Sequence, residues 1–204
     1  VLHAMLDAKL APDPFYRKNE YEVRELLDQD FCYTLYFTPQ KEVLAQQYAE
    51  LVFYGLDTLA DIRLNGEFLG MVDNMHRTWH FPVSGRLKAG ENCLEIVFHS
   101  SLRYIREKGQ DAIVHYVAKG CIRGNNFLRK AHCMFGWDWG PRIPDGGILR
   151  DVTVCYRDAA WIEDVHIRQR HEEGYVTLAI QAEMGKGGRE DLPIFYEVSV
   201  TAPD

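Results

Sequence analysis

Two tryptophans and one carboxylate stand side by side in this chain, as Trp137, Asp138 and Trp139. Gly136 and Gly140 bracket the trio, and a core strand has no need of such turn residues. The apolar face of an indole suits the C–H face of a sugar ring, and an ionised carboxylate accepts strong hydrogen bonds from hydroxyl groups. The residue types therefore indicate a carbohydrate site; the alternative is a tight structural corner in which the indoles are packed.

Hydrolysis of a glycosidic bond requires further residues. It uses two carboxyl groups about 5–10 Å apart, one protonated and one ionised, and the sequence contains no recognisable acid/nucleophile motif. Asp145 lies between a proline and a glycine, which predicts a turn residue. The basic pair Arg129 and Lys130 either orients Asp138 or a sugar hydroxyl, or balances local acidic residues.

Metal and cofactor sites are not expected. His76 and His80 are four residues apart, but the surrounding residues predict a strand, in which four residues span about 13 Å and one ion cannot bind both side chains. The sequence has no Cys-x-x-Cys pair, nucleophile elbow, phosphate-binding loop or dinucleotide fingerprint.

The bulk composition narrows the choice of partner. The chain has 204 residues and a formal net charge of −7. Nucleic acids and anionic membrane surfaces select clustered Lys and Arg, so neither is expected as a partner. No apolar run approaches the roughly 20 residues of a membrane-spanning helix.

The cysteines and the N-terminus bear on the compartment. The chain has five cysteines, an odd number, and several lie in apolar runs, which predicts buried free thiols in a reducing compartment. The charged N-terminal stretch does not resemble a signal peptide, and we expect a cytoplasmic protein. Because the chain begins with Val1, we also expect it to be part of a longer protein.

Strands dominate the first three quarters of the chain. The Asn65-Gly66 pair is typical of a two-residue hairpin turn, with Ile62 and Leu64 on one face and Arg63 on the other. Short strands joined by tight turns predict an all-β sandwich of the jelly-roll type. The predicted strands are 31–39, 47–54, 61–70, 78–83, 92–99 and 151–156.

Helices are few, and one long segment has no regular period. Asn19 with Glu22 predicts an N-cap and its N3 partner, and Ser100 or Ser101 predicts the start of a second short helix that ends at Gly109. Residues 110–147 have no clean periodicity but many aromatic side chains, which indicates a functional loop region rather than disorder.

The sequence changes character after residue 158. Residues 161–170, 175–183 and 194–201 predict three more strands, with a connection at 184–192. Three strands cannot form a two-sheet sandwich, which needs about seven. We therefore expect a first domain at 1–158 and an incomplete, immunoglobulin-like second domain at 159–204.

Several motifs occur together in a characteristic order. They are Asp13-Pro14-Phe15 with Asn19-Glu20, Gly55-Leu56-Asp57-Thr58, Leu64-Asn65-Gly66, Leu69-Gly70, Asn74-Met75-His76 with Trp79, Arg129-Lys130, Cys133, Phe135-Gly136-Trp137-Asp138-Trp139-Gly140-Pro141, and Gly147-Ile148 with Arg150-Asp151. Over nearly its whole length the chain resembles the N-terminal part of the β-mannosidases of glycoside hydrolase family 2. The Asn-Gly hairpin and the last motif are shared more widely in that family.

The resemblance implies a multidomain retaining exo-β-mannosidase. In such enzymes a galactose-binding-like jelly roll and an immunoglobulin-like sandwich precede a (β/α)₈ barrel, and the barrel holds both catalytic glutamates. By resemblance, Asp138 contacts the sugar in the −1 subsite, and Trp137 and Trp139 shape its wall. From the basic pair, Arg129 is expected to support this contact. The expected partners are a β-mannoside or manno-oligosaccharide and the C-terminal barrel of the same chain.

Three interpretations remain open at this stage. A barrel alone needs about 250 residues, so this chain is expected to hold no catalytic residue and to be inactive by itself. The second interpretation is a stand-alone carbohydrate-binding module. The third is the structural corner, in which Asp138 has no ligand.

Overall fold

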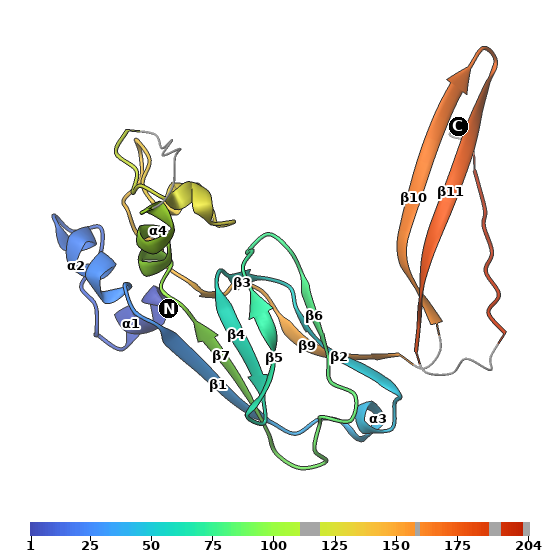
Figure 1. Ribbon diagram of the computed structural model, residues 1–204, viewed down its shortest axis with the longest axis horizontal. Coiled ribbons are helices and arrows are strands. Elements are labelled where there is room, and N and C mark those ends of the chain that lie inside the picture. Colours follow the sequence, from blue (N-terminus) through green and yellow to red (C-terminus); the bar gives the residue numbers. More distant parts are fainter. Residues whose placement is uncertain (111–118, 158–159, 188–192, 202–204) are drawn as a thin grey trace.

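Two antiparallel sheets packed face to face form the body of the protein (Figure 1). The computed structural model describes residues 1–110, 119–157, 160–187 and 193–201. One sheet has the order β1-β7-β4-β5 and the other β6-β2-β9, which confirms the all-β sandwich. Their strands are β1 (Phe31–Phe37), β2 (Tyr48–Phe53), β4 (Ala60–Leu64), β5 (Glu67–Val72), β6 (Trp79–Pro82), β7 (Asn92–Phe98) and β9 (Val152–Arg157).

The core lies between these two sheets. Alternate side chains of β7 and β4 are buried while their neighbours face outward, because successive side chains of a strand point to opposite faces. The central strand β2 contributes Phe53, whose ring meets the edge of Phe81 at 5.8 Å. The buried residues of the two sheets include Ala49, Leu51, Phe53, Ile62, Leu64, Leu94, Ile96 and Phe98.

The predicted hairpin is confirmed. Strands β4 and β5 are joined by Asn65 and Gly66, with φ angles of 55° and 84°. Both residues occupy the left-handed region that a type I′ turn requires. Ile62 and Leu64 are buried and Arg63 is exposed, as the alternation predicted.

The helices are short and lie at the edges of the sandwich. Ser100 caps α4 (Ser101–Gly109), because its side chain accepts a hydrogen bond from the Arg103 amide, and this prediction is confirmed. The Asn19 cap was wrong: Asn19 is the first residue of α2 (Asn19–Leu26), and its side chain donates to the Asp13 carbonyl at 2.9 Å. The remaining helices are α1 (Leu2–Asp7) and α3 (Lys41–Leu44).

The predicted irregular segment 110–147 is irregular wherever the structure describes it. It contains two single 3₁₀ turns, η1 (Asn125–Phe127) and η2 (His132–Met134), and ends in β8 (Gly147–Ile148). Strand β8 pairs with β3 (Leu56–Asp57), which directly follows the central strand β2. This small sheet ties the end of the segment to the sandwich.

A long hairpin of β10 (Ala160–Glu172) and β11 (Tyr175–Lys186) follows the sandwich (Figure 1). It begins beside β2, where the Trp161 and Tyr48 rings are 4.9 Å apart. The predicted third strand was wrong, since residues 193–201 form no strand with any described segment. A strand is defined by hydrogen bonds to a partner, and β10 and β11 pair with each other. Part of the predicted connection, 188–192, lies outside the described residues.

The cysteines are free, as predicted, but the prediction that they are buried was wrong. Cys32 and Cys133 are exposed, and Cys93, Cys121 and Cys155 are partly exposed. Cys32 lies in an apolar run, yet on the outer face of β1. Among the helices of the described ranges, none is long and apolar enough to cross a membrane.

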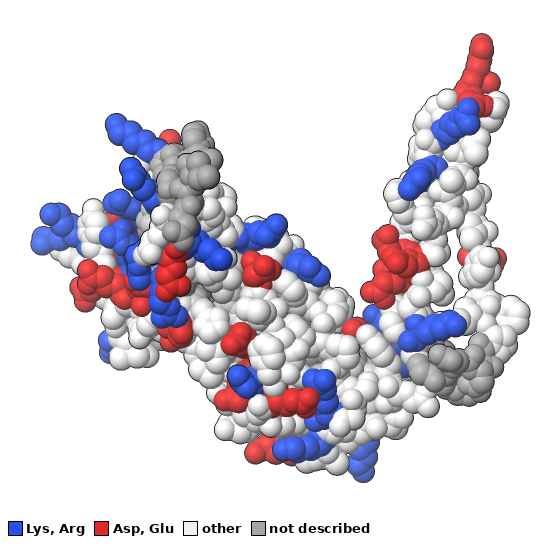
Figure 2. Space-filling model, viewed as in Figure 1, with Lys and Arg blue, Asp and Glu red and all other residues white. Residues whose placement is uncertain are grey.

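A cluster of ion pairs attaches α4 to the start of β1. Arg106 meets Asp28 at 2.6 Å, and Arg103 pairs with Asp30. The Ser100 hydroxyl also donates to Asp28, at 2.5 Å. Figure 2 shows acidic and basic side chains gathered at the end of the molecule that carries α2 and α4.

This cluster predicts a loss of stability in acid. Partial burial raises the pKa of Asp28, but hydrogen bonds from Arg106 and Ser100 outweigh it and hold the pKa below its ordinary value of 3.8. Between the lowered pKa of the folded protein and 3.8, Asp28 binds more protons in the unfolded chain than in the folded one. The stabilisation that Asp28 contributes is therefore complete above pH 3.8 and is lost as the pH falls further. Denaturant unfolding at pH 5 and at pH values below 4 should show a smaller loss in Asp28→Asn than in the parent. An equal loss in both would contradict the prediction, and the exposed Asp7→Asn serves as the control.

Candidate functional site

The Trp-Asp-Trp loop is a small hairpin, which we define as residues 135–142. Phe135 and Arg142 form an antiparallel bridge at its base. Near the tip, Trp137 and Gly140 exchange backbone hydrogen bonds of 3.4 Å in both directions. This pairing places Asp138 and the second tryptophan at the turn itself.

The side chains at this turn face solvent. Trp137 is 50% exposed and Trp139 is 74% exposed, and Asp138 is also exposed. Phe135, by contrast, is fully buried in a small cluster with Leu102, Ile105 and Leu128. The loop is therefore held by its phenylalanine, while the indoles and the carboxylate are accessible.

Neighbouring segments brace the Trp-Asp-Trp loop on both sides. The Cys121 thiol donates to the Gly136 carbonyl at 2.7 Å, and the Ile122 amide donates to the Phe135 carbonyl at 2.8 Å. On the other side, Arg142 donates to Glu20 of α2 at 3.1 Å. These contacts restrict a loop that presents large apolar groups to water.

Arg129 lies beside the Asn-Met-His motif rather than in an ion pair with Asp138. It forms a parallel bridge with Asn74, and its carbonyl accepts from the Met75 amide at 3.0 Å. Its side chain is exposed. No ion pair joins Arg129 to Asp138, both of which the structure describes.

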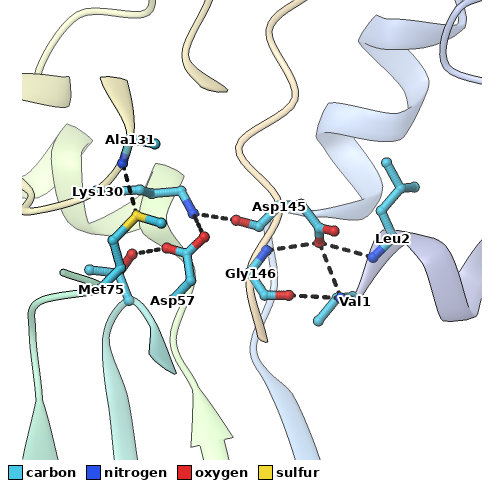
Figure 3. A network of polar contacts seen from close by, with 9 residues as sticks. Val1, Leu2, Asp57, Met75, Lys130, Ala131, Asp145 and Gly146 are labelled. Carbon is cyan, nitrogen blue, oxygen red and sulfur yellow. Dashed lines mark hydrogen bonds and ion pairs between the residues drawn. The ribbon is translucent and has the colours of Figure 1, made fainter. Parts of the chain in front are cut away.

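The adjacent Lys130 has the opposite environment (Figure 3). Its ammonium is 2.5 Å from the Asp57 carboxylate, and the two side chains are 0% and 1% exposed. It also donates to the Asp145 carbonyl. The sequence left two roles open for the basic pair: orienting Asp138 or a sugar hydroxyl, or balancing local acidic residues. Lys130 has the second role, since it balances the charge of Asp57.

Sequence reasoning missed this pair. Asp57 had no local signal beyond its place in the Gly-Leu-Asp-Thr motif, since its partner lies 73 positions away. Burial lowers the pKa of Lys130, and the Asp57 charge opposes that shift.

Asp145 is in a turn, as predicted, but its carboxylate also accepts from the Leu2 amide at the start of α1, at 2.9 Å.

An open apolar groove of about 440 Å³ borders the Trp-Asp-Trp loop. One wall is formed by Trp139 and Pro141 and another by Phe15, which is 78% exposed. The groove could receive an apolar face of a ligand or of a neighbouring polypeptide.

The histidines considered as metal ligands do not share a site. His80 lies on β6 and is 3.3 Å from the buried Glu50, whereas the His76 amide donates to the Asn74 side chain. Within the part of the chain that the structure describes, no cluster of three or more His, Cys, Asp or Glu side chains could hold a metal ion.

The glycines of the Trp-Asp-Trp loop allow a matched test of its geometry. Gly136 has a φ of 111°, and a Cβ there would lie 2.6 Å from Arg142 Cγ and 3.1 Å from the Gly120 carbonyl. Gly136→Ala should therefore destabilise the protein by about 1–3 kcal/mol in denaturant unfolding. At Gly140 a Cβ meets no atom within 4 Å, and Gly140→Ala should change stability by less than about 0.5 kcal/mol. Equal effects would contradict the described loop.

Comparison with known proteins places this geometry in context. A β-mannosidase from Bos taurus is 32% identical over 158 residues, which cover 74% of this chain and 18% of the relative. β-Mannosidase B from Emericella nidulans is 32% identical over 190 residues, covering 90% and 22%. The chain thus spans about a fifth of the length of these relatives.

Solved structures agree with this likeness. A β-D-mannosidase from Dictyoglomus thermophilum aligns with a TM-score of 0.79 and 32% identity, covering 89% of this chain and 22% of that one. An exo-chitosanase from Amycolatopsis orientalis aligns with a TM-score of 0.60 at 17% identity, covering 91% and 20%, and supports the fold alone. The family of glycosyl hydrolase 2 galactose-binding domain-like sequences matches residues 1–150. On the sandwich fold and this match, the chain belongs to the glycosyl hydrolase 2 galactose-binding domain-like family.

Proposed function

We propose that this chain is the N-terminal, non-barrel region of a retaining exo-β-mannosidase that removes terminal β-linked mannose. The curated relatives described above bear the name β-mannosidase, and a β-D-mannosidase structure superimposes over most of the chain. In this proposal residues 1–158 form the sandwich domain and residues 159–204 begin an immunoglobulin-like domain. The two catalytic glutamates belong to a barrel elsewhere in the whole protein, where carboxyl groups about 5–5.5 Å apart would give retention.

One observation carries the proposed role of this region. A braced hairpin presents the exposed Asp138 carboxylate, whose neighbours in sequence are two tryptophans that are half and three-quarters exposed. Exposing indoles to water is unfavourable, so a ligand or a neighbouring domain that covers them gains apolar burial. We assign Asp138 to hydroxyls of the sugar in the −1 subsite, Trp137 and Trp139 to its wall, and Arg129 to a supporting polar contact.

The carboxylate can orient a sugar without taking part in bond cleavage. An ionised acceptor forms stronger hydrogen bonds with hydroxyl groups than a neutral one. Holding the ring at a fixed place and angle beside the catalytic groups lowers the entropic part of the barrier. The described residues thus supply recognition, and the barrel supplies the covalent chemistry.

Asp138→Asn in the full-length protein tests the assignment. The amide keeps the shape but loses the charge, so kcat/KM on a β-mannoside should fall by about 10- to 100-fold. Because Asp138 is exposed, the melting temperature should stay the same. The exposed Asp164→Asn on β10 is the matched control. Unchanged kinetics with a lower melting temperature would show a structural corner instead.

The isolated chain should be catalytically silent. Residues 1–204, purified and incubated with a chromogenic β-mannoside, should release no more chromophore than buffer does. Turnover that copurifies with the chain through successive columns would overturn the placement of the catalytic glutamates outside it.

A stand-alone carbohydrate-binding module is the second candidate, and the exposed indoles favour it. Calorimetric titration of the chain with manno-oligosaccharides separates the two functions. An independent module binds them by itself, whereas one wall of a −1 subsite binds too weakly to measure.

A cytoplasmic location stays a prediction.

A further inference from the structure

The buried ammonium of Lys130 joins both ends of the segment that carries the Trp-Asp-Trp loop. The segment begins at residue 131, directly after Lys130, and ends at residue 144, directly before Asp145. Lys130 donates to the Asp145 carbonyl and, at 2.5 Å, to the Asp57 carboxylate. One side chain therefore closes the base of the segment and ties it to β3 (Figure 3).

Further contacts extend this base on either side. The Ala131 amide donates to the Met75 sulfur at 2.9 Å, so the first residue of the segment also contacts the Asn-Met-His motif. The Asp145 carboxylate accepts from the Leu2 and Gly146 amides, at 2.9 and 2.8 Å. The base is thus held by α1, β3 and the loop before β6, which are far apart in sequence.

The tip of the segment has different neighbours. Its contacts run to Cys121 and Ile122 of another irregular stretch and to Glu20 of α2. None of these three residues belongs to the two main sheets. The base, by contrast, is joined directly to β3, the short strand that follows β2 of the sandwich.

A charged pair is an unusual choice for such a base. Removing a charged lysine and a charged aspartate from water has a free-energy cost that offsets much of their mutual attraction. Apolar residues of similar volume often stabilise a protein to the same extent. An ammonium differs from an apolar group because it can donate hydrogen bonds to several acceptors at once. The pair specifies geometry, since it fixes a carboxylate on β3 and a carbonyl at the end of the segment around one nitrogen.

We propose that Lys130, paired with Asp57, is a positioning residue that sets where the Trp-Asp-Trp loop presents Asp138 to the sugar. The inference rests on the proposed function for its catalytic consequence. Its structural part, that the pair determines the position and rigidity of the loop, does not.

The test uses the Asp57→Asn/Lys130→Met variant of the full-length protein. This double variant removes both charges together, so no unpaired buried charge remains to unfold the protein. Hydrogen–deuterium exchange of residues 135–140 should become faster by about tenfold or more, with little change in the sandwich strands. On a β-mannoside, kcat should fall by about tenfold or more, because a small displacement of a positioning group is costly.

A matched control removes an exposed pair by the same type of change. Arg86 and Glu67 form an ion pair of 3.4 Å on the sandwich, outside the segment. Glu67→Gln/Arg86→Met should leave the exchange of residues 135–140 and kcat as in the parent. If the first variant does not fold, Asp57→Leu/Lys130→Met repeats the test with an apolar pair.

The readouts separate this inference from the proposed function. Unchanged exchange of residues 135–140 overturns the positioning role, even if kcat falls. Faster exchange with unchanged kcat shows that the pair positions the loop but overturns the role of the loop in catalysis, and with it the proposed function. Faster exchange with a lower kcat and a melting temperature near that of the parent supports both.

Discussion

The placement of the candidate site depends, in our proposal, on one buried ion pair, between Lys130 and Asp57. Its two side chains are almost completely excluded from water. Burial lowers the pKa of the lysine, and the aspartate charge opposes this shift, so each group makes the burial of the other tolerable. The pair connects the irregular segment that begins after Lys130 to β3, the strand that follows the central strand β2.

The sandwich supplies the rigidity that this connection needs. A continuous apolar core between the sheets fixes β2, and β3 follows β2 after only two residues. Asp57 therefore occupies a well-defined place. The segment between Lys130 and Asp145 can then remain irregular, with exposed indoles at its tip, because its base and its flanks are held by specific polar contacts. This division suits recognition of a ligand by a loop on a rigid scaffold.

Local patterns predicted the elements that depend on local physics. The alternation of apolar residues located β1, β2, β6, β7 and β9, and the Asn65-Gly66 turn located the β4–β5 hairpin. The short pieces α1, α3, β3 and β8 had no such signal. The third strand at 194–201 failed for another reason: its alternation suits a strand, but a strand also requires a neighbour to pair with.

The sequence by itself determined the family, the sandwich and the identity of the residues at the candidate site, because motif order, periodicity and turn chemistry are all local properties. Tertiary structure alone decided which member of the Arg129–Lys130 pair is buried, that Asp57 is its partner, and that the two indoles face solvent. These features depend on how segments far apart in the chain pack together. Arg129 and Lys130 are adjacent and have the same charge, so the sequence around them does not indicate which of the two is buried.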